Sequence, residues 1–111
     1  MAEDLGKTST GIQANVAALL SYILGWVTGL VFFLIEKDNK FVRFHAMQSL
    51  ALFGGLTVLT IVLTFVPVIG WALLPVVYLV EFVLWIILMI KAYQGEKFKL
   101  PIAGDFAEKN A

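Results

Sequence analysis

The amino-acid sequence predicts an all-α integral membrane protein with three transmembrane helices in a small bundle. Of the 111 residues, 60% are hydrophobic and 14% are charged, whereas soluble domains average about 45 to 50% apolar and about 25% charged residues. The charges gather near the N-terminus, around residues 36–43 and beyond residue 90, with Glu81 alone between them. The uncharged tracts therefore predict membrane spans, and the charged segments predict the connections outside the membrane.

The first uncharged tract predicts one membrane span over residues 14–35. As a helix this segment is about 33 Å long, which is enough to cross the hydrocarbon core of a bilayer once. Small residues recur along it at four-residue intervals, at Ala17, Ser21, Gly25 and Gly29. Such a stripe lets two helix backbones approach closely in lipid. We expect it to pack against another helix of the same chain or, alternatively, against a second copy.

The second uncharged tract predicts two further spans. It runs from residue 46 to residue 90 with Glu81 as its one interruption, which is about twice the length of a single crossing. Pro67 and Gly70 lie near its centre, where proline removes a backbone donor and favours a reversal of the chain. The predicted segments are a span at residues 46–66, a tight outer turn at residues 67–70 and a span at residues 71–90.

The charged segments predict how these spans are oriented. With three spans, residues 1–13 lie on one side of the membrane, and the loop at residues 36–45 and the tail at residues 91–111 lie on the other. The loop and tail carry every basic residue except Lys7, and basic residues favour the cytoplasm. The sequence therefore predicts a protein of the cytoplasmic membrane with an extracytoplasmic N-terminus and a cytoplasmic C-terminus.

The loop at residues 36–45 predicts a further local element. Asp38 and Asn39 are both suited to cap a new helix, and aromatic and basic residues alternate just after them. We therefore expect a short interfacial helix before the second span.

Glu81 is the sharpest single feature of the spans. A carboxylate at membrane depth costs several kcal/mol and normally faces a protein interior, a cavity or an ion path. On a helix, Tyr78 and Trp85 lie on the same face as Glu81. We expect a structural hydrogen bond at Glu81, with ion or proton handling as the alternative.

The composition excludes several functional classes. Eight basic residues balance eight acidic ones, so no net positive field is available to attract nucleic acid. The chain has no cysteine and one histidine, which excludes thiolate chemistry and leaves a metal site without its usual ligands. Known catalytic motifs are absent from the sequence. We expect no enzyme activity, no cofactor, no metal and no nucleic-acid partner.

The run from Asn39 to Leu50 indicates a family. It resembles the signature of small prokaryotic membrane proteins of unknown function that are related to the Tic-twenty component of protein import at the chloroplast inner envelope. The resemblance extends over residues 15–108. It implies a helical membrane protein with a cytoplasmic signature loop that serves protein translocation or membrane assembly. It points to the following signature positions as interaction or structural residues: Phe41, Arg43, His45, Gln48 and Ser49.

We therefore predict a small membrane scaffold or interaction subunit, whose signature segment contacts lipid headgroups or a partner. Its partners would be the lipid bilayer and either another membrane protein or further copies of the chain. The alternative is an oligomeric transport element for ions, protons or small solutes, in which Glu81 titrates beside a polar seam. That seam would include hydroxyl side chains of the second span, although such hydroxyls also bond to their own helix backbone: Ser49, Thr57, Thr60 and Thr64.

Overall fold

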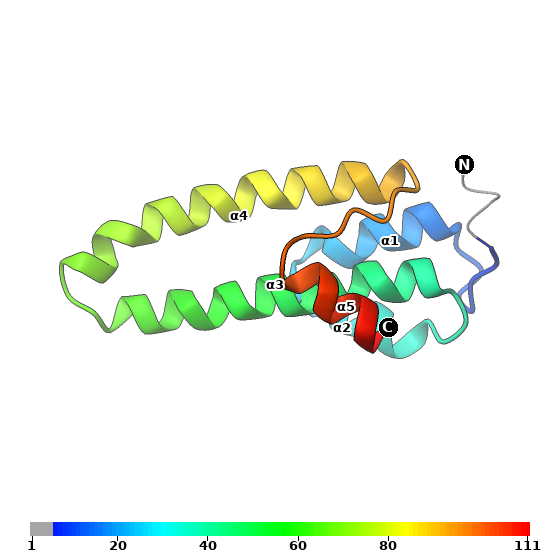
Figure 1. Cartoon of the computed structure of the whole chain (residues 1–111), viewed down its shortest axis with the longest axis horizontal. Coiled ribbons are helices and arrows are strands. Elements are labelled where there is room, and N and C mark those ends of the chain that lie inside the picture. The colour runs from blue at the N-terminus through cyan, green and yellow to red at the C-terminus, as the bar shows by residue number, and fades with distance from the viewer. Residues whose placement is uncertain (1–5) are drawn as a thin grey trace.

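The computed structural model describes residues 6–111, and the regular elements in that range are five α-helices (Figure 1). Two of them are 25 residues long and the others have ten residues or fewer. In chain order they are α1 (Ala14–Ile23), α2 (Trp26–Ile35), α3 (Lys40–Thr64), α4 (Ile69–Tyr93) and α5 (Ala103–Asn110).

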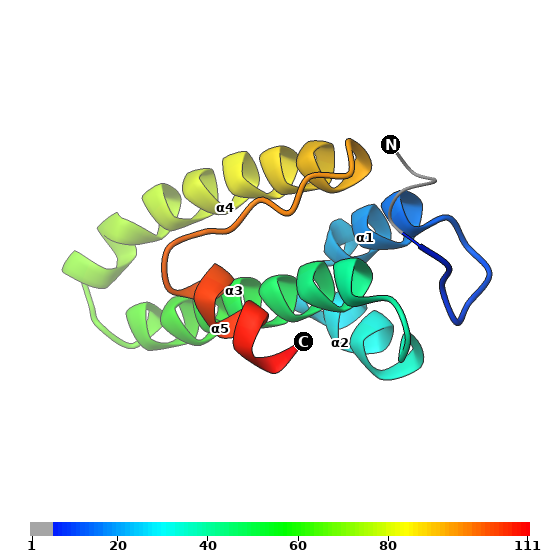
Figure 2. The same ribbon diagram turned by 45° about the vertical axis from the view of Figure 1, so that its right-hand side comes forward.

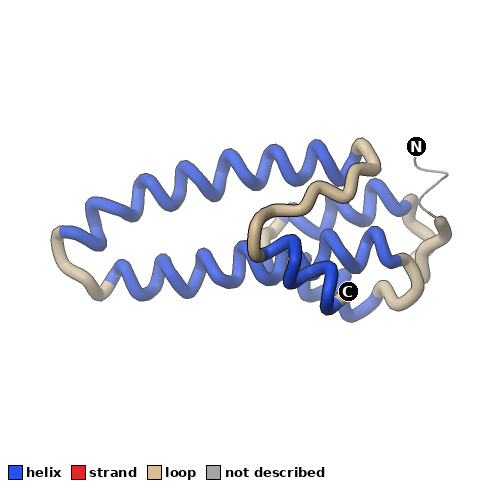
Figure 3. The backbone as a smooth tube through the Cα atoms, in the orientation of Figure 1, coloured by secondary structure: helices blue, strands red, loops and turns tan. Residues whose placement is uncertain are grey.

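The molecule is elongated, with principal extents of 49, 22 and 21 Å. The two long helices run along its length, and the three short helices gather at one end (Figures 1 and 3). We call the crowded end the base, and it consists of residues 6–53 and residues 85–111. We call the remaining helical hairpin, residues 54–84, the arm. The base holds the core, and the arm has little of its own chain around it.

The predicted first span is not one helix, because the chain reverses at Gly25. The φ and ψ angles of Gly25 are 65° and −133°, a conformation that glycine adopts far more readily than other residues. Each of α1 and α2 has ten residues, which is about 15 Å of helix and about half of a bilayer core. Helix α1 lies beside the base halves of α3 and α4, and α2 lies beside the base half of α3 (Figure 2). The segment at residues 14–35 is therefore a short hairpin, and three spans are not confirmed.

This reversal brings the segment before α1 next to the loop after α2. The backbone N–H of Ser9 donates to the carboxylate of Glu36 at 2.8 Å, and the Asn39 side chain donates to the Lys7 carbonyl at 3.1 Å. Groups in hydrogen-bond contact cannot lie on opposite sides of a membrane. The structure therefore places the described residues 6–13 against the loop at residues 36–45, whereas the sequence predicted opposite sides of the membrane for them, and residues 1–5 lie outside the described range.

Two helices in residues 6–111 are long and apolar enough to cross a membrane. They are α3 and α4, with mean hydropathies of 1.9 and 2.6 over their most apolar windows. They contain the predicted spans at residues 46–66 and 71–90 with small shifts, since α3 ends at Thr64 and α4 begins at Ile69. The outer turn therefore lies at residues 65–68 instead of 67–70.

The expected interfacial helix is not separate from the second span. Residues 40–45 form the first turns of α3. Asn39 caps this helix, because its side-chain oxygen accepts the backbone N–H of Val42 at 3.0 Å, as predicted for an Asn at this position.

Burial differs sharply between the two ends of the molecule. The fully buried side chains lie in the base, where Tyr22 of α1, Phe44 of α3 and Leu88 of α4 are at most 1% exposed. In the arm, by contrast, Phe65 is 80% exposed and Val68 is 73% exposed. Apolar side chains this exposed are typical of a surface covered by lipid or by another protein.

Candidate functional site

The signature histidine lies in a buried polar network at the centre of the base. His45 is completely buried, and its Nε2 lies 2.9 Å from the carbonyl oxygen of Glu96. Because a carbonyl only accepts, Nε2 carries the hydrogen, and Nδ1 must accept from the Tyr22 hydroxyl at 2.6 Å. The network therefore assigns a neutral imidazole and one tautomer.

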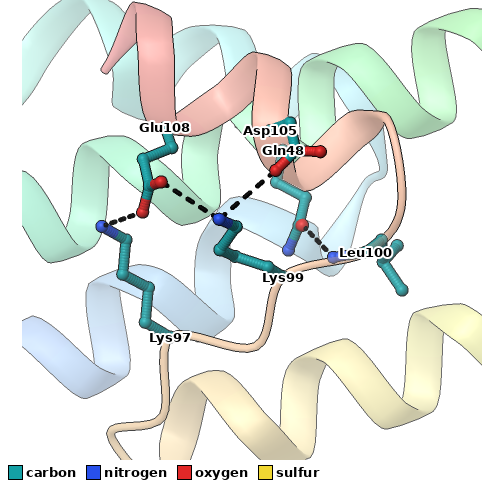
Figure 4. A network of polar contacts seen from close by, with 6 residues as sticks. All are labelled: Gln48, Lys97, Lys99, Leu100, Asp105 and Glu108. Carbon is teal, nitrogen blue, oxygen red and sulfur yellow. Dashed lines mark hydrogen bonds and ion pairs between the residues drawn. The ribbon is translucent and has the colours of Figure 1, made fainter.

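Gln48 completes the same network with its whole amide group. Its Nε2 donates to the Tyr22 hydroxyl at 3.0 Å and to the carbonyl oxygen of Phe98 at 2.9 Å. Its Oε1 accepts the backbone N–H of Leu100 at 2.9 Å (Figure 4). His45 and Gln48 thus fasten the connection between α4 and α5, residues 94–102, to α3. We call this connection the strap.

Ser49, in contrast, stabilises the chain reversal at Gly25. The Ser49 hydroxyl donates to the carbonyl oxygen of Gly25 at 2.9 Å. On the other side of the turn, the Thr28 hydroxyl accepts the N–H of Leu24 at 3.1 Å and donates to the carbonyl of Ser21 at 3.1 Å. Backbone groups freed by the helix break are thereby paired, as a break within an apolar region requires.

The predicted stripe of small residues serves packing within the chain. A Cβ atom added to Gly29 would lie 2.8 Å from the carbonyl oxygen of Ala46, so α2 and α3 meet at backbone distance there. Ala17 and Ser21 are fully buried in α1, and the Ser21 hydroxyl donates to the carbonyl of Ala17 at 3.0 Å. Gly25 is the reversal itself and not a member of one continuous helix face.

Arg43 binds the end of α2. Its Nη1 donates to the carbonyl oxygens of Phe33 and Glu36 at 3.0 and 2.7 Å, and its guanidinium lies 4.2 Å from the centre of the Phe33 ring. These bonds satisfy carbonyls that the end of a helix leaves unpaired. Phe41 is half-buried, and its ring meets the His45 ring edge-on at 4.7 Å. Both signature residues are therefore engaged within the chain.

Glu36 is a structural residue that the sequence analysis did not single out. Its side chain is fully buried, and its carboxylate accepts the backbone N–H groups of Ser9, Asp38 and Asn39 at 2.8, 3.1 and 3.0 Å. Burial raises the pKa of Glu36, but these donors outweigh burial, so the pKa lies below its ordinary value. The sequence signal was an acid three residues before the helix cap Asn39.

Ion pairs close the outer face of the base. Lys97 and Lys99 of the strap approach Glu108 of α5 at 3.1 and 3.0 Å, and Lys99 also approaches Asp105 at 3.3 Å (Figure 4). Such exposed pairs contribute little individually. Backbone contact positions α5 more firmly, since a Cβ on Gly104 would lie 2.8 Å from the Cα of Lys99.

Glu81 lies away from this network, midway along α4. It lines a hollow of about 240 Å³ together with Gly25, Phe53, Phe82 and Trp85. No hydrogen bond or ion pair joins its carboxylate to another residue of the described chain, so the expected structural hydrogen bond is not seen.

The predicted polar seam is not a continuous one in the arm. The hydroxyls of Thr57, Thr60 and Thr64 each donate to the carbonyl four residues earlier, at 2.7, 2.8 and 2.8 Å. They are thus paired with their own helix backbone. Among residues 6–111, no group of three or more His, Cys, Asp or Glu side chains is placed to hold a metal ion.

Comparison with known proteins identifies the family. Residues 7–107 match the model of the magnetosome magnetite crystal formation protein family. The chain is 54% identical over 105 residues to a UPF0132 membrane protein of Methanocaldococcus jannaschii, covering 95% of this chain and 94% of that protein. It is 52% identical over 98 residues to a UPF0132 membrane protein of Archaeoglobus fulgidus, covering 88% of this chain and 95% of that protein. The chain belongs to this family.

Membership of the magnetosome magnetite crystal formation family confirms the coarser part of the sequence prediction. The chain is one of a group of prokaryotic membrane proteins, and the match covers both long helices, the strap and most of α5. The relation to the Tic-twenty component stays a prediction. No solved structure matches the chain.

Proposed function

We propose that this protein is a small integral membrane scaffold, anchored by α3 and α4 and presenting the charged end of the base at one membrane surface. The observation that carries the proposal is the division of polarity along the molecule. The arm exposes apolar side chains along its length, and Glu81 is its one charged residue. All eight basic residues lie in the base: Lys7, Lys37, Lys40, Arg43, Lys91, Lys97, Lys99 and Lys109.

The proposed orientation has two crossings and a re-entrant hairpin. Each of α3 and α4 has 25 residues, or about 37 Å of helix, which suits a bilayer core of about 30 Å. The α1–α2 hairpin enters the leaflet on the side of the charged end of the base and returns to the same membrane surface. Because basic residues favour the cytoplasm, the base and both ends of the described chain face inward. This replaces the extracytoplasmic N-terminus that the sequence suggested.

The polar side chains favour a binding role over a catalytic one, because they are hydrogen-bonded within the chain. Apart from the Asn15 Oδ1 atom, the buried polar groups of the base are paired with backbone groups or with each other, which produces a rigid platform. From the family's description we carry over only a membrane-associated role. Service to protein translocation or membrane assembly is a narrower version, supported by the resemblance of the Phe41 to Ser49 run alone.

Labelling of single cysteines tests the orientation, since the natural chain has none. We propose Lys7→Cys, Lys40→Cys, Lys109→Cys and Val68→Cys, each probed with an impermeant maleimide on sealed vesicles of known sidedness. The first three variants are expected to react only from the cytoplasmic side, and Val68→Cys only from the other. Labelling of Lys7→Cys from outside, with Lys40→Cys labelled from inside, would restore the three-span arrangement and contradict this proposal.

Site-specific photocrosslinking tests the scaffold role itself. A crosslinker at exposed Lys37 in the base should yield a discrete adduct with a protein, either another species or a second copy. The same crosslinker at Phe82 in the arm is the matched control and should yield mainly lipid adducts. Lipid adducts alone from both positions would show that the base has no protein partner and would overturn the scaffold proposal.

A further inference from the structure

The α1–α2 hairpin is shorter than the two long helices, and a hollow lies where the hairpin turns back. The hairpin ends at Gly25, level with Phe53 of α3 and Trp85 of α4, and beyond it the two long helices continue without α1 or α2 between them (Figure 1). The hollow of about 240 Å³ lies at this point. Its walls therefore come from α3, from α4 and from the reversal itself.

The hollow combines one carboxylate with aromatic rings. Phe82 and Trp85 lie with ring centres 6.1 Å apart at an angle of 38°. The Trp85 indole is fixed, because its Nε1 donates to the carbonyl oxygen of Tyr22 at 2.6 Å. Phe53 is held edge-on against the Tyr22 ring at 6.4 Å. The aromatic wall beside Glu81 is thus preorganised by contacts to the base.

Glu81 needs either a proton or a positive partner in this position. It lies midway along α4, so the proposed orientation puts it near the middle of the bilayer, where an unpaired carboxylate is costly. The basic residues of the chain all lie in the base, and none forms an ion pair with Glu81 among the described residues. An ionised Glu81 must therefore take its positive partner from outside the described chain.

The residues that line the hollow favour one kind of cation over another. Inorganic ions such as Ca²⁺ require six or more oxygen ligands, whereas Glu81 is the one carboxylate in the hollow. The neighbouring carbonyl oxygen of Gly25 already accepts the Ser49 hydroxyl. Aromatic faces, in contrast, attract organic cations, and a carboxylate adds a charge partner. The composition of the hollow matches an organic cation.

We propose that this hollow binds a hydrophobic organic cation, such as a quaternary ammonium, a phosphonium or a protonated amine with apolar substituents. Its charge pairs with Glu81, and its substituents lie against Phe82 and Trp85. Phe82 is 55% exposed and faces the lipid side, so such a cation enters from the bilayer. The inference rests on the membrane placement of α4 in the proposed function.

Binding of tetraphenylphosphonium to the purified full chain tests the proposal. The chain is placed in nanodiscs of zwitterionic lipid, and bound probe is measured by equilibrium dialysis against protein-free nanodiscs. We expect saturable binding of one probe per chain. Glu81→Gln, which keeps the shape and removes the charge, should weaken binding at least tenfold. Glu96→Gln makes the same chemical change at an exposed position of the base and should bind as the natural chain does.

Two further measurements separate site binding from general effects. Gel filtration and thermal unfolding of Glu81→Gln verify that the variant is folded. Triphenylphosphine oxide, a neutral probe of similar rings, should bind equally to the natural chain and to Glu81→Gln.

Several outcomes would overturn the inference. Equal tetraphenylphosphonium affinity of the natural chain and folded Glu81→Gln would remove Glu81 as the counter-ion. An equal loss in Glu81→Gln and Glu96→Gln would show an effect of net charge alone. A lack of binding above protein-free nanodiscs would refute the site directly. The cysteine labels report orientation independently of Glu81, so the inference can fail while the proposed topology holds.

Discussion

The two halves of α3 show how the same helix is used in two different surroundings. In the base, residues 42 and 44–49 are all buried, and this run includes His45, Gln48 and Ser49. In the arm, most residues from 58 onward are exposed, and the polar ones are threonines. The base half can contain amide and imidazole groups because α1 and the strap supply partners for them. The arm half has no such neighbours, so its hydroxyls bond to their own helix.

Polar substitutions should therefore change the free energy of unfolding by different amounts in the two halves of α3. Removing a polar group in the base leaves buried partners unpaired, which costs about 1 to 3 kcal/mol for each group. Removing a hydroxyl in the arm leaves only a helix carbonyl that is already bonded.

Gln48→Leu should have the largest effect. It leaves the Phe98 carbonyl and the Leu100 N–H without their partner and removes a donor to the Tyr22 hydroxyl. We expect a loss of about 4 kcal/mol in the free energy of unfolding, measured by denaturant titration in detergent. The strap should also be cleaved faster by trypsin after Lys97 and Lys99. Slow cleavage with an unchanged unfolding midpoint would contradict the role given to Gln48.

Gly29→Leu should come next. A side chain at this position meets the Ala46 carbonyl and the Leu50 nitrogen of α3 at 2.8 and 3.0 Å, so α2 must move away. Overpacking of this kind costs about 1 to 3 kcal/mol, and we expect about 3. Gly55→Leu is the matched control, because a Cβ at Gly55 has no atom within 4 Å. Equal destabilisation by both changes would show that close packing at Gly29 is unimportant.

Glu36→Gln should cost about 2 kcal/mol at neutral pH, since bonds from N–H groups to a charged acceptor are stronger than those to a neutral one. The folded pKa of Glu36 lies below the ordinary value of 4.5. Its stabilisation is therefore present above that ordinary value and is lost as the pH falls through the folded pKa. The stability difference between the natural chain and Glu36→Gln should shrink below about pH 4.5. A difference that is constant from pH 7 to pH 3 would contradict the ionised carboxylate.

Thr60→Val should have the smallest effect. The Thr60 hydroxyl donates to the Leu56 carbonyl within its own helix, and its loss should change the free energy of unfolding by less than about 0.5 kcal/mol. Ser49→Ala, which removes a base hydroxyl from the Gly25 carbonyl, should cost about 1 kcal/mol. Reversed effects would mean that the arm, and not the base, depends on side-chain hydrogen bonds.

Much of the fold was predictable from the sequence. The long apolar tracts predicted the helical class and the two long helices, and Pro67 placed the outer turn within a few residues. Asn39, one of the two residues expected to cap a helix there, is the cap of α3. These features depend on local chemistry and on length, which the sequence states directly.

The reversal at Gly25 could not be predicted in the same way. The segment from Ala14 to Ile35 has the length and composition of one crossing, and a hairpin of two short helices uses the same residues. The G-x-x-x-G spacing of Gly25 and Gly29 is typical of helix packing, and only Gly29 serves that purpose. The decisive bond, from Ser49 to the Gly25 carbonyl, joins residues 24 positions apart.

The structure gives the signature residues bonding partners that the sequence does not indicate. The sequence singled out Arg43, His45 and Gln48, which the structure places in the base. Each of them bonds to backbone groups, and the backbone partners of His45 and Gln48 lie about 50 residues further along the chain. Both also bond to the Tyr22 hydroxyl. Nothing local in the sequence indicates such partners. The structural role of Glu36 was missed because an acidic residue in a charged loop is normally expected to be solvated.

The outer turn between α3 and α4 has a consequence for how the protein enters the membrane. Residues 65–68 read Phe-Val-Pro-Val and carry no charge. In the proposed orientation, with the charged end of the base facing the cytoplasm, this turn is the one segment of the described chain that must be carried fully across the hydrocarbon core. The arm can therefore insert as a single apolar hairpin, tip first, and the transfer of charged loops through lipid is avoided altogether.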